Sequence, residues 1–228
     1  MRAFAHLIVS AFSFLLVSGA VAADKAKPAR VGVKPAADSI PLFDGKTLKG
    51  WKLSDFAAQG GAEVATSAKD GPVIIVEQGE VLSGITYTNR VPRVDYEISL
   101  EAMKLSGSDF MCGLTFPVKG EHATLILGGW GGGVVGISSI DGSDASENET
   151  TKYLKFDKNV WYRVRVRVTA NKIEAWLDDE KIADLELAGK KVAMRPGEIE
   201  SAIPVSLSTY QTRAAYRNLR LKKLSGAN

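Results

Sequence analysis

The chain has 228 residues, a formal net charge of +3 and a single cysteine, Cys112. It contains no basic block interleaved with aromatic residues, so it lacks the electrostatic pattern of a nucleic-acid-binding protein and we expect no nucleic-acid partner. One cysteine excludes an intrachain disulfide, and a chain of this length can bury a sizeable core without one.

The N-terminus has the pattern of an export signal. Residues 1–6 carry one arginine and no acid, residues 7–17 are almost wholly apolar, and small residues follow at 18–23. This pattern predicts a signal peptide over residues 1–23 that is cleaved near Ala22 or Ala23, with an uncleaved anchor as the alternative. The apolar run is shorter than the roughly 20 residues of a membrane span, so we expect a secreted or periplasmic protein without a span after signal removal.

Residues 24–39 are rich in alanine, lysine and proline. Such a segment buries too little apolar surface to offset its ordering entropy, so it is predicted to be a linker. Residues 40–225 are then predicted to form a single domain.

Short segments of alternating polarity recur along this domain, and no long segment has helical periodicity. In the clearest strand, residues 161–169, valines and a tyrosine alternate with three arginines, which is typical of an antiparallel sheet with one buried face. The pattern predicts an all-β sandwich of two antiparallel sheets, with one short helix near residues 55–68. The main expected strands are residues 73–77, 81–88, 95–104, 110–116, 161–169, 172–177, 203–210 and 215–224.

The expected strand at 110–116 places Cys112 on a strongly apolar face. Alternation puts Phe110, Cys112, Leu114 and Phe116 on one side of this strand. A thiol in such surroundings is predicted to be buried and inert, since a reactive thiol needs a basic or polar neighbourhood.

Five glycines surround Trp130 in the segment 128–133. Glycine costs backbone entropy on folding, so the segment indicates a local requirement for bare backbone. One interpretation is a ligand that approaches the backbone, with Trp130 as a flat platform for a sugar ring. The other is a tight strand crossing with Trp130 in the core.

The segment 141–150 holds four carboxylates, Asp141, Asp144, Glu147 and Glu149. Hard cations such as Ca²⁺ prefer oxygen ligands, so Asp141, Asp144 and Glu149 are candidate calcium ligands, although the spacing differs from the helix-loop-helix calcium motif. The alternative is an ordinary solvated loop that binds no cofactor.

Three further residues are candidates for chemistry. His122 is the only histidine after residue 23 and is either a general base or a surface residue. Asp109 follows a Gly-Ser break and either points into a cleft or forms the turn. Arg213 either binds a carbonyl or carboxylate with its fork of donors or pairs with a loop acid.

The segment Leu42-Phe43-Asp44-Gly45-Lys46-Thr47-Leu48-Lys49-Gly50-Trp51 resembles the opening motif of the 3-keto-disaccharide hydrolase domain family. The segments 96–98, 161–166 and 216–221 keep the order of that family. The resemblance implies a jelly-roll sandwich of the concanavalin/laminin-G type, exported by bacteria, whose concave sheet holds a carbohydrate. Family members commonly carry Asn-Ser-Gly at residues 111–113, and a Glu and a Gln within residues 122–127, so no catalytic residue transfers position by position.

The resemblance implies a lyase or hydrolase acting on 3-keto glycosides, with an oxidised glycoside or polysaccharide as partner. A ketone at C3 acidifies the hydrogen at C2, so a base can remove it and the C1 aglycone leaves. The predicted catalytic residues are His122, Asp109, Arg213 and Glu147, and the predicted substrate-binding residues are Trp130, Tyr210 and Gln211. The alternative is a non-catalytic carbohydrate-binding or envelope adhesion module, because one fold hosts both roles.

Overall fold

The computed structural model describes residues 38–224, which form an all-β domain. The predicted signal peptide and nearly all of the predicted linker lie outside the described residues. Ser39, at the end of the predicted linker, is instead the first residue of strand β1 (Ser39–Pro41). Among residues 38–224, no helix is both long and apolar enough to cross a membrane.

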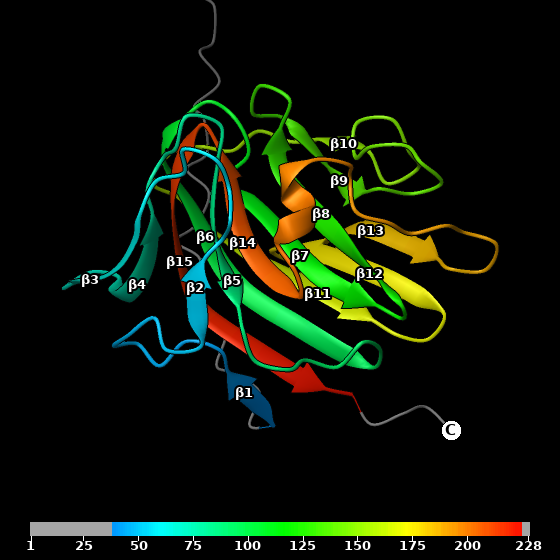
Figure 1. Ribbon diagram of the computed structural model, residues 1–228, viewed down its shortest axis with the longest axis horizontal. Helices are drawn as coiled ribbons and strands as arrows, with labels where there is room; N and C mark the ends of the chain where they lie inside the picture. The colour runs from blue at the N-terminus through cyan, green and yellow to red at the C-terminus, as the bar shows by residue number, and fades with distance from the viewer. Residues whose placement is uncertain (1–37, 225–228) are drawn as a thin grey trace, which may run out of the picture. The chain divides into compact units, whose positions relative to one another are not determined.

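The first sheet, here called sheet A, lies at the back in Figure 1. Its strands are β1, β3 (Ala62–Ser67), β4 (Gly71–Val76), β6 (Tyr96–Gly107), β11 (Trp161–Val168), β12 (Lys172–Leu177), β13 (Glu180–Glu186) and β15 (Thr212–Lys223). Within the described residues the order is β13-β12-β11-β6-β15-β4-β3, and β1 pairs with β15 beside this path.

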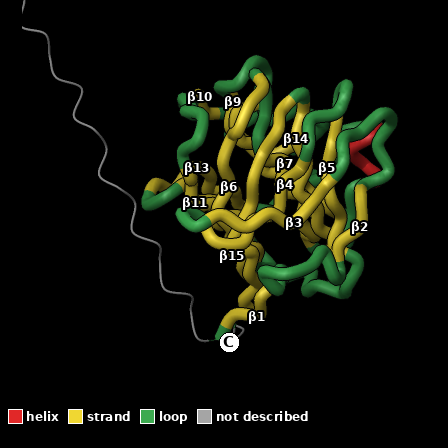
Figure 2. The backbone as a smooth tube through the Cα atoms, turned by 90° about the vertical axis from the view of Figure 1, so that its left-hand side faces the viewer, coloured by secondary structure: helices red, strands yellow, loops and turns green. Residues whose placement is uncertain are grey.

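The second sheet, here called sheet B, lies in front of sheet A (Figure 1). Its strands are β2 (Trp51–Leu53), β5 (Leu82–Tyr87), β7 (Cys112–Val118), β8 (Glu121–Gly129), β9 (Val134–Ser138), β10 (Lys152–Tyr153) and β14 (Val205–Tyr210). The order is β10-β9-β8-β7-β14-β5-β2 for the part of the chain that is described. Figure 2 shows the layers from the side, with the 3₁₀ helix η1 (Glu198–Ser201), drawn in red, beside sheet B.

The core lies between the sheets, as the alternation of β11 predicts. Val164, Val166 and Val168 are buried in it. The arginines between them point to the outer face of sheet A, where Arg165 and Arg167 both pair with Glu97. The predicted two-sheet antiparallel sandwich is confirmed.

Three local predictions have different outcomes. The prediction of a helix near residues 55–68 is wrong, because residues 62–67 pair with β4 as strand β3. Cys112 is buried as predicted, and burial raises the pKa of its thiol to about 12. Phe110, however, does not share the face of Cys112, because β7 begins only at Cys112 and the alternation does not extend back to Phe110.

The motif at residues 42–51 forms a corner that leads the chain into sheet B. The indole Nε1 of Trp51 donates to the carbonyl oxygen of Leu42 at 2.7 Å, and both residues are buried. Asp44 Oδ1 accepts hydrogen bonds from the backbone N–H groups of Lys46 and Thr47, each at 2.7 Å. These bonds lower the pKa of Asp44 to about 2. We call residues 42–51 the motif corner.

Candidate functional site

The outer face of sheet B is lined with small and hydroxyl-bearing side chains. Leu114, Leu125 and Leu207 point into the core, so their strand neighbours point outward. The strand register aligns five outward hydroxyl residues in a row across the sheet, namely Ser138, Thr124, Thr115, Ser206 and Thr86. Side chains this short leave room above the sheet for another layer.

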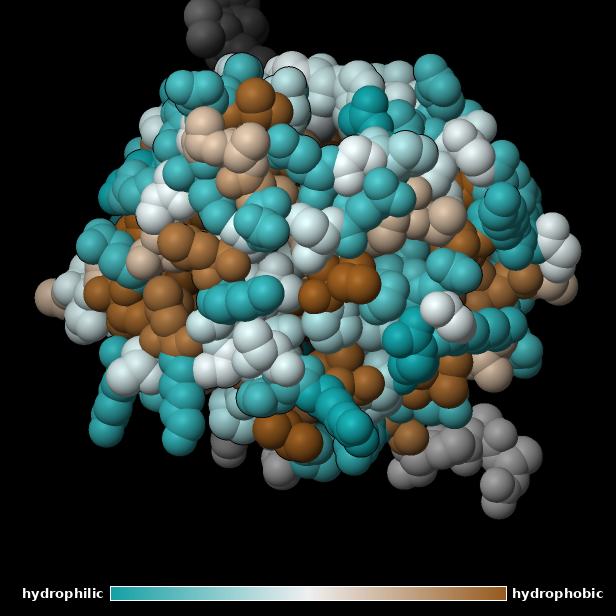
Figure 3. Space-filling model, in the orientation of Figure 1, coloured by the Kyte–Doolittle hydropathy of each residue, from teal (hydrophilic) through white to brown (hydrophobic). Residues whose placement is uncertain are grey.

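Part of that room is filled by residues 188–204, which we call the crossing segment. It contains the 3₁₀ helix η1 (Glu198–Ser201), which lies in front of sheet B in Figure 1. Ile199 and Ala202 pack against Phe56, and the Met194 sulfur lies 3.8 Å from the Thr124 hydroxyl. All five residues of the hydroxyl row are buried, and the contact of Met194 with Thr124 shows that the crossing segment covers part of this row. Figure 3 shows this face as a mixture of hydrophobic and hydrophilic residues.

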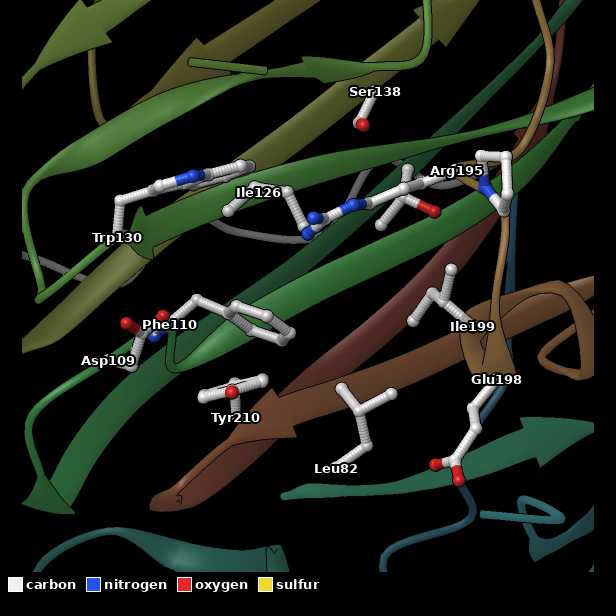
Figure 4. Close-up of a pocket in the computed structure, with 12 residues that line it drawn as sticks. Leu82, Asp109, Phe110, Ile126, Trp130, Ser138, Arg195, Glu198, Ile199 and Tyr210 are labelled. Carbon is white, nitrogen blue, oxygen red and sulfur yellow. Dashed lines mark hydrogen bonds between the residues drawn. The ribbon is translucent and has the colours of Figure 1, made fainter. Parts of the chain in front are cut away.

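A cleft of about 380 Å³ remains between the crossing segment and the turn that joins β8 to β9. Figure 4 shows the side chains that line it. Its lining consists of Leu82, Asp109, Phe110, Thr124, Ile126, Trp130, Ser138, Arg195, Pro196, Glu198, Ile199 and Tyr210. We call this the Trp130 cleft.

Trp130 stands on the tight turn between β8 and β9. Its backbone has φ +49°. Trp130 is 43% exposed, so it is not a core tryptophan. Gly132 follows with φ +105°, and a Cβ there would lie 2.8 Å from the carbonyl oxygen of Ser108. Bare backbone is therefore required at Gly132, and the platform interpretation of Trp130 agrees with its exposure.

Asp109 fixes this turn to the edge of the cleft. Its Oδ2 accepts a hydrogen bond from the Gly131 N–H, and its Oδ1 accepts one from the Phe110 N–H, both at 2.7 Å. The carboxylate is thus held in one orientation, and each oxygen keeps a further lone pair for a ligand.

Arg195 reaches into the cleft from the crossing segment (Figure 4). Its guanidinium carbon lies 5.6 Å from the centre of the Trp130 ring, within the range of a cation–π contact. Its Nε pairs with Asp144 at 3.1 Å, and the Ser138 hydroxyl donates to the same carboxylate. Arg195 is therefore anchored on one side while its terminal nitrogens face the cleft.

The apolar floor of the cleft is built from Phe110, Ile126 and Tyr210. The rings of Phe110 and Tyr210 lie 5.9 Å apart at an interplanar angle of 44°. Glu198 stands at the far end from Trp130, and its carboxylate points away from the ring (Figure 4). The cleft thus combines an aromatic surface with a fixed carboxylate and a fixed guanidinium, a combination suited to a ligand with apolar faces and many hydroxyls.

Of the predicted site residues, Asp109, Trp130 and Tyr210 are brought together in this cleft. Gln211 follows Tyr210 but is exposed, and its side-chain amide faces the carbonyl oxygen of Glu80 at 3.4 Å. It does not line the cleft.

His122 lies on the same outer face as Thr124 but outside the cleft lining, toward the turn between β7 and β8. Burial lowers the pKa of His122, the nearby Arg93 lowers it further, and Glu121 partly opposes both. Its Nε2 is buried and has no hydrogen-bond partner among residues 38–224.

Arg213 and Glu147 lie away from the cleft lining. Arg213, on β15 of sheet A, pairs with Glu77 at 2.7 Å. Glu147 is exposed in the loop between β9 and β10. The structure therefore does not bring the four predicted catalytic residues to one place.

The predicted calcium ligands are engaged by basic side chains. Lys190 pairs with Asp141 at 3.1 Å and with Glu149 at 2.8 Å, while Asp144 pairs with Arg195. The Lys191 backbone N–H and the Lys190 ammonium both lower the pKa of Asp141. No group of three or more histidine, cysteine or acidic residues suited to a metal is found among residues 38–224.

Sequence reasoning missed Phe110, Arg195 and Glu198 as cleft residues. The crossing segment has no periodic pattern, so nothing in the sequence places it over sheet B. The one available signal was the Arg195-Pro196-Gly197 run, which marks a turn with an exposed cation.

Comparison with solved structures shows the same fold in carbohydrate-related proteins. The β-glucanase of Bacillus licheniformis is 10% identical with a TM-score of 0.52, covering 83% of this chain and 100% of that chain. Domain 4 of AbnA, a GH43 extracellular arabinanase from Geobacillus stearothermophilus, was solved in complex with arabinotriose. It is 12% identical with a TM-score of 0.50, covering 76% of this chain and 82% of that chain. Identities this low show the fold alone.

No curated protein matches the chain. The sequence model of the 3-keto-alpha-glucoside-1,2-lyase-like domain, however, matches residues 38–222. This match spans nearly all of the described domain and confirms the resemblance that begins at the motif corner. The chain therefore belongs to the 3-keto-alpha-glucoside-1,2-lyase-like domain family.

Proposed function

We propose that the Trp130 cleft binds a saccharide and that the domain cleaves 3-keto glycosides by elimination across C1 and C2. One observation carries this proposal. The exposed ring of Trp130 opens onto a cleft that also holds the fixed carboxylate of Asp109 and the guanidinium of Arg195. A sugar ring stacked on Trp130 would present its oxygens to both charged groups.

The chemistry needs a base, a donor at the ketone and an acid for the leaving oxygen. Asp109 is the proposed base that removes the C2 hydrogen, and Arg195 the donor that stabilises the negative charge on the C3 oxygen. The bond from C1 to the aglycone oxygen then breaks, and a double bond forms between C1 and C2. The aglycone leaves as an alcohol after its oxygen takes a proton from the Tyr210 hydroxyl. Subsequent addition of water at C1 makes the overall reaction a hydrolysis.

The family assignment supports this reaction class, and the arabinotriose held by the arabinanase domain supports a saccharide as the ligand. The pattern of residues 1–23 supports export, so we place the activity outside the cytoplasm, either secreted or periplasmic. The roles predicted for His122, Glu147 and Arg213 are not carried into this proposal, because these residues lie outside the cleft lining.

A second candidate is a saccharide-binding module without catalysis. It is favoured by the engagement of both Asp109 oxygens with backbone N–H groups and by the lack of a histidine in the lining of this cleft as described. Here Asp109 would only hold the Trp130 turn in place.

Aglycone release from an aryl 3-keto glucoside separates the two candidates. If the domain is an enzyme, Asp109→Asn lowers the rate by about 10²- to 10⁴-fold, the range for loss of a general base. Arg195→Met lowers it independently and leaves the Asp109 hydrogen bonds intact. Arg165→Met, on the outer face of sheet A, is the matched control and keeps the wild-type rate.

Saccharide binding without release by the wild-type protein would support the binding module. Neither binding nor release, across neutral and oxidised sugars, would overturn the proposal as a whole.

A further inference from the structure

A second depression lies on the other side of the glycine turn from the Trp130 cleft. Its lining includes Lys104, Ser108, Gly131, Gly132, Tyr153 and Lys158. The two depressions are neighbours along the chain, since Asp109 and Trp130 line the first while Ser108 and Gly131 line the second. The glycine turn is thus the shared edge of the two depressions, and a ligand that crossed this turn would contact both.

Lys104 is the unusual residue of this second depression. Ile98, Leu100 and Ala102 on β6 point into the core, and Lys104 continues that alternation at the end of the sandwich. It is only 4% exposed, and a methyl group added at Gly132 would lie 3.6 Å from its Nζ. No hydrogen bond or ion pair of its ammonium group is found within residues 38–224.

An ammonium group at the end of a side chain this buried has little access to water, so the lack of a direct partner is costly. Burial lowers the pKa of Lys104, and Lys158 lowers it further, while the Asp109 carboxylate partly restores it. Asp109 is not within ion-pair distance and directs its oxygens to the backbone. An anion in the depression would give Lys104 the partner that it lacks among the described residues.

The rest of the lining suits an anion that is attached to a ring. Lys104, Lys155 and Lys158 bring three ammonium groups, and no acidic residue within 38–224 lines the depression. Lys155 pairs with the exposed Asp157 at 3.0 Å, which leaves Lys104 and Lys158 as the nearest cations for a ligand. Tyr153 is 75% exposed and offers a flat aromatic face beside them.

We propose that this depression is a second saccharide subsite that takes a sugar unit bearing a carboxylate, of the uronic acid class. Its carboxylate binds to Lys104 and Lys158, and its ring packs on Tyr153. The inference rests on the proposed saccharide function of the Trp130 cleft, which binds the neighbouring unit of the same ligand. Free phosphate could also bind to the two lysines as an anion, but it has no ring that could pack on Tyr153.

Calorimetry on the protein tests this with three probes, namely a neutral trisaccharide, the same trisaccharide with a terminal glucuronate, and inorganic phosphate. We expect the acidic trisaccharide to bind about tenfold more tightly than the neutral one, the worth of one charge-assisted hydrogen bond. Lys104→Met and Lys158→Met each remove that advantage, whereas Tyr153→Ala weakens both trisaccharides, because the terminal ring of each packs on it, and leaves phosphate binding unchanged. Lys69→Met, on an exposed turn away from the depression, is the control and should retain the higher affinity for the acidic trisaccharide.

The outcomes separate this inference from the proposed function. Equal affinity for the neutral and acidic probes overturns the subsite and leaves the Trp130 cleft standing. Phosphate that binds as tightly as the acidic probe, with no effect of Tyr153→Ala, also overturns it. A chain that binds neither trisaccharide fails at the proposed function itself. If Lys104→Met does not fold, Lys158→Met and Tyr153→Ala still decide the case.

Discussion

The motif corner and the Trp130 cleft each contain one tryptophan, and the two tryptophans have opposite roles. Trp51 in the corner is 8% exposed and its indole N–H is bonded to the Leu42 carbonyl oxygen. Trp130 is 43% exposed and stands on a turn of φ +49°. The ring of Trp51 is therefore part of the core, whereas the ring of Trp130 is open to solvent at the edge of the cleft.

This difference teaches that the segment which carries the family resemblance is not the segment at which we propose ligand binding. None of the residues at 42–51 lines the Trp130 cleft. Asp44, the acid of the motif, is bound by backbone N–H groups of its own turn. The family motif is therefore a folding element, and the proposed ligand site lies elsewhere.

The largest expected effect lies in the corner. Trp51→Ala should lower the free energy of unfolding by about 3–5 kcal/mol, because it removes a large buried side chain. Trp51→Phe keeps most of the packing but loses the hydrogen bond to Leu42. This lost bond should lower the free energy of unfolding by about 1 kcal/mol, in addition to any loss of packing. Urea denaturation measures both, and a loss below about 1 kcal/mol for Trp51→Ala would show that the corner is not a stabilising element.

Gly132→Ala should destabilise the protein by about 1–3 kcal/mol, because φ +105° and the 2.8 Å approach to Ser108 exclude a Cβ. The substitution also moves the Trp130 turn, so saccharide affinity should fall with it. Gly120→Ala is the control, since no atom lies within 4 Å of the added Cβ. Equal stability of the two variants would contradict the requirement for bare backbone at Gly132.

Trp130→Ala should leave the free energy of unfolding within about 0.5 kcal/mol of wild type, as for an exposed side chain. Its affinity for a saccharide should fall about tenfold, through the loss of the stacking surface. Calorimetry with a neutral oligosaccharide measures this, and Trp176→Ala on sheet A serves as control. Unchanged affinity would remove Trp130 from the site.

The pH dependence of the corner should be small and of known sign. The pKa of Asp44 is about 2 in the folded chain, below its ordinary value of 3.8. An acid whose pKa is lower in the folded state stabilises that state at pH values above its ordinary pKa. This stabilisation is lost as the pH falls through 3.8 toward 2. The melting temperature of wild type should therefore exceed that of Asp44→Asn at pH 6, and the gap should close near pH 2. A gap that is constant with pH would contradict this.

The smallest expected effect concerns the acidic loop. A chelator should leave the melting temperature unchanged, because Lys190 and Arg195 already neutralise Asp141, Glu149 and Asp144. A metal bound only by the folded state would raise stability, so a fall in melting temperature on chelation would restore the calcium interpretation.

Most of the sandwich could be predicted from alternation. The valines of β11 and the leucines of β15 mark the buried faces, and strand β12 was predicted at its observed bounds, Lys172–Leu177. The alternation failed where strands begin or bulge. Phe110 precedes β7, and β15 bulges between Arg217 and Arg220, where Asn218 has φ +56°.

The site was predicted only in part, for a physical reason. Asp109, Trp130 and Tyr210 lie at strand ends or turns, and the glycines and polar residues around such positions can be recognised in the sequence. Arg195 reaches the cleft through a segment whose path over sheet B is set by tertiary packing of Ile199 and Ala202. Local sequence carries no record of that packing.

The attachment of the crossing segment has a consequence for how relatives of this domain diversify. One wall of the cleft is a strand ladder, where any insertion shifts the register and reverses every side chain. The opposite wall is not a strand of that ladder, and its backbone pairs only with the residues that follow β9, at Ile140 with Val192 and at Ser139 with Ala193, among the described residues. Insertions and deletions in this second wall leave the ladder untouched, so natural variation in ligand choice should concentrate there while the sandwich stays constant.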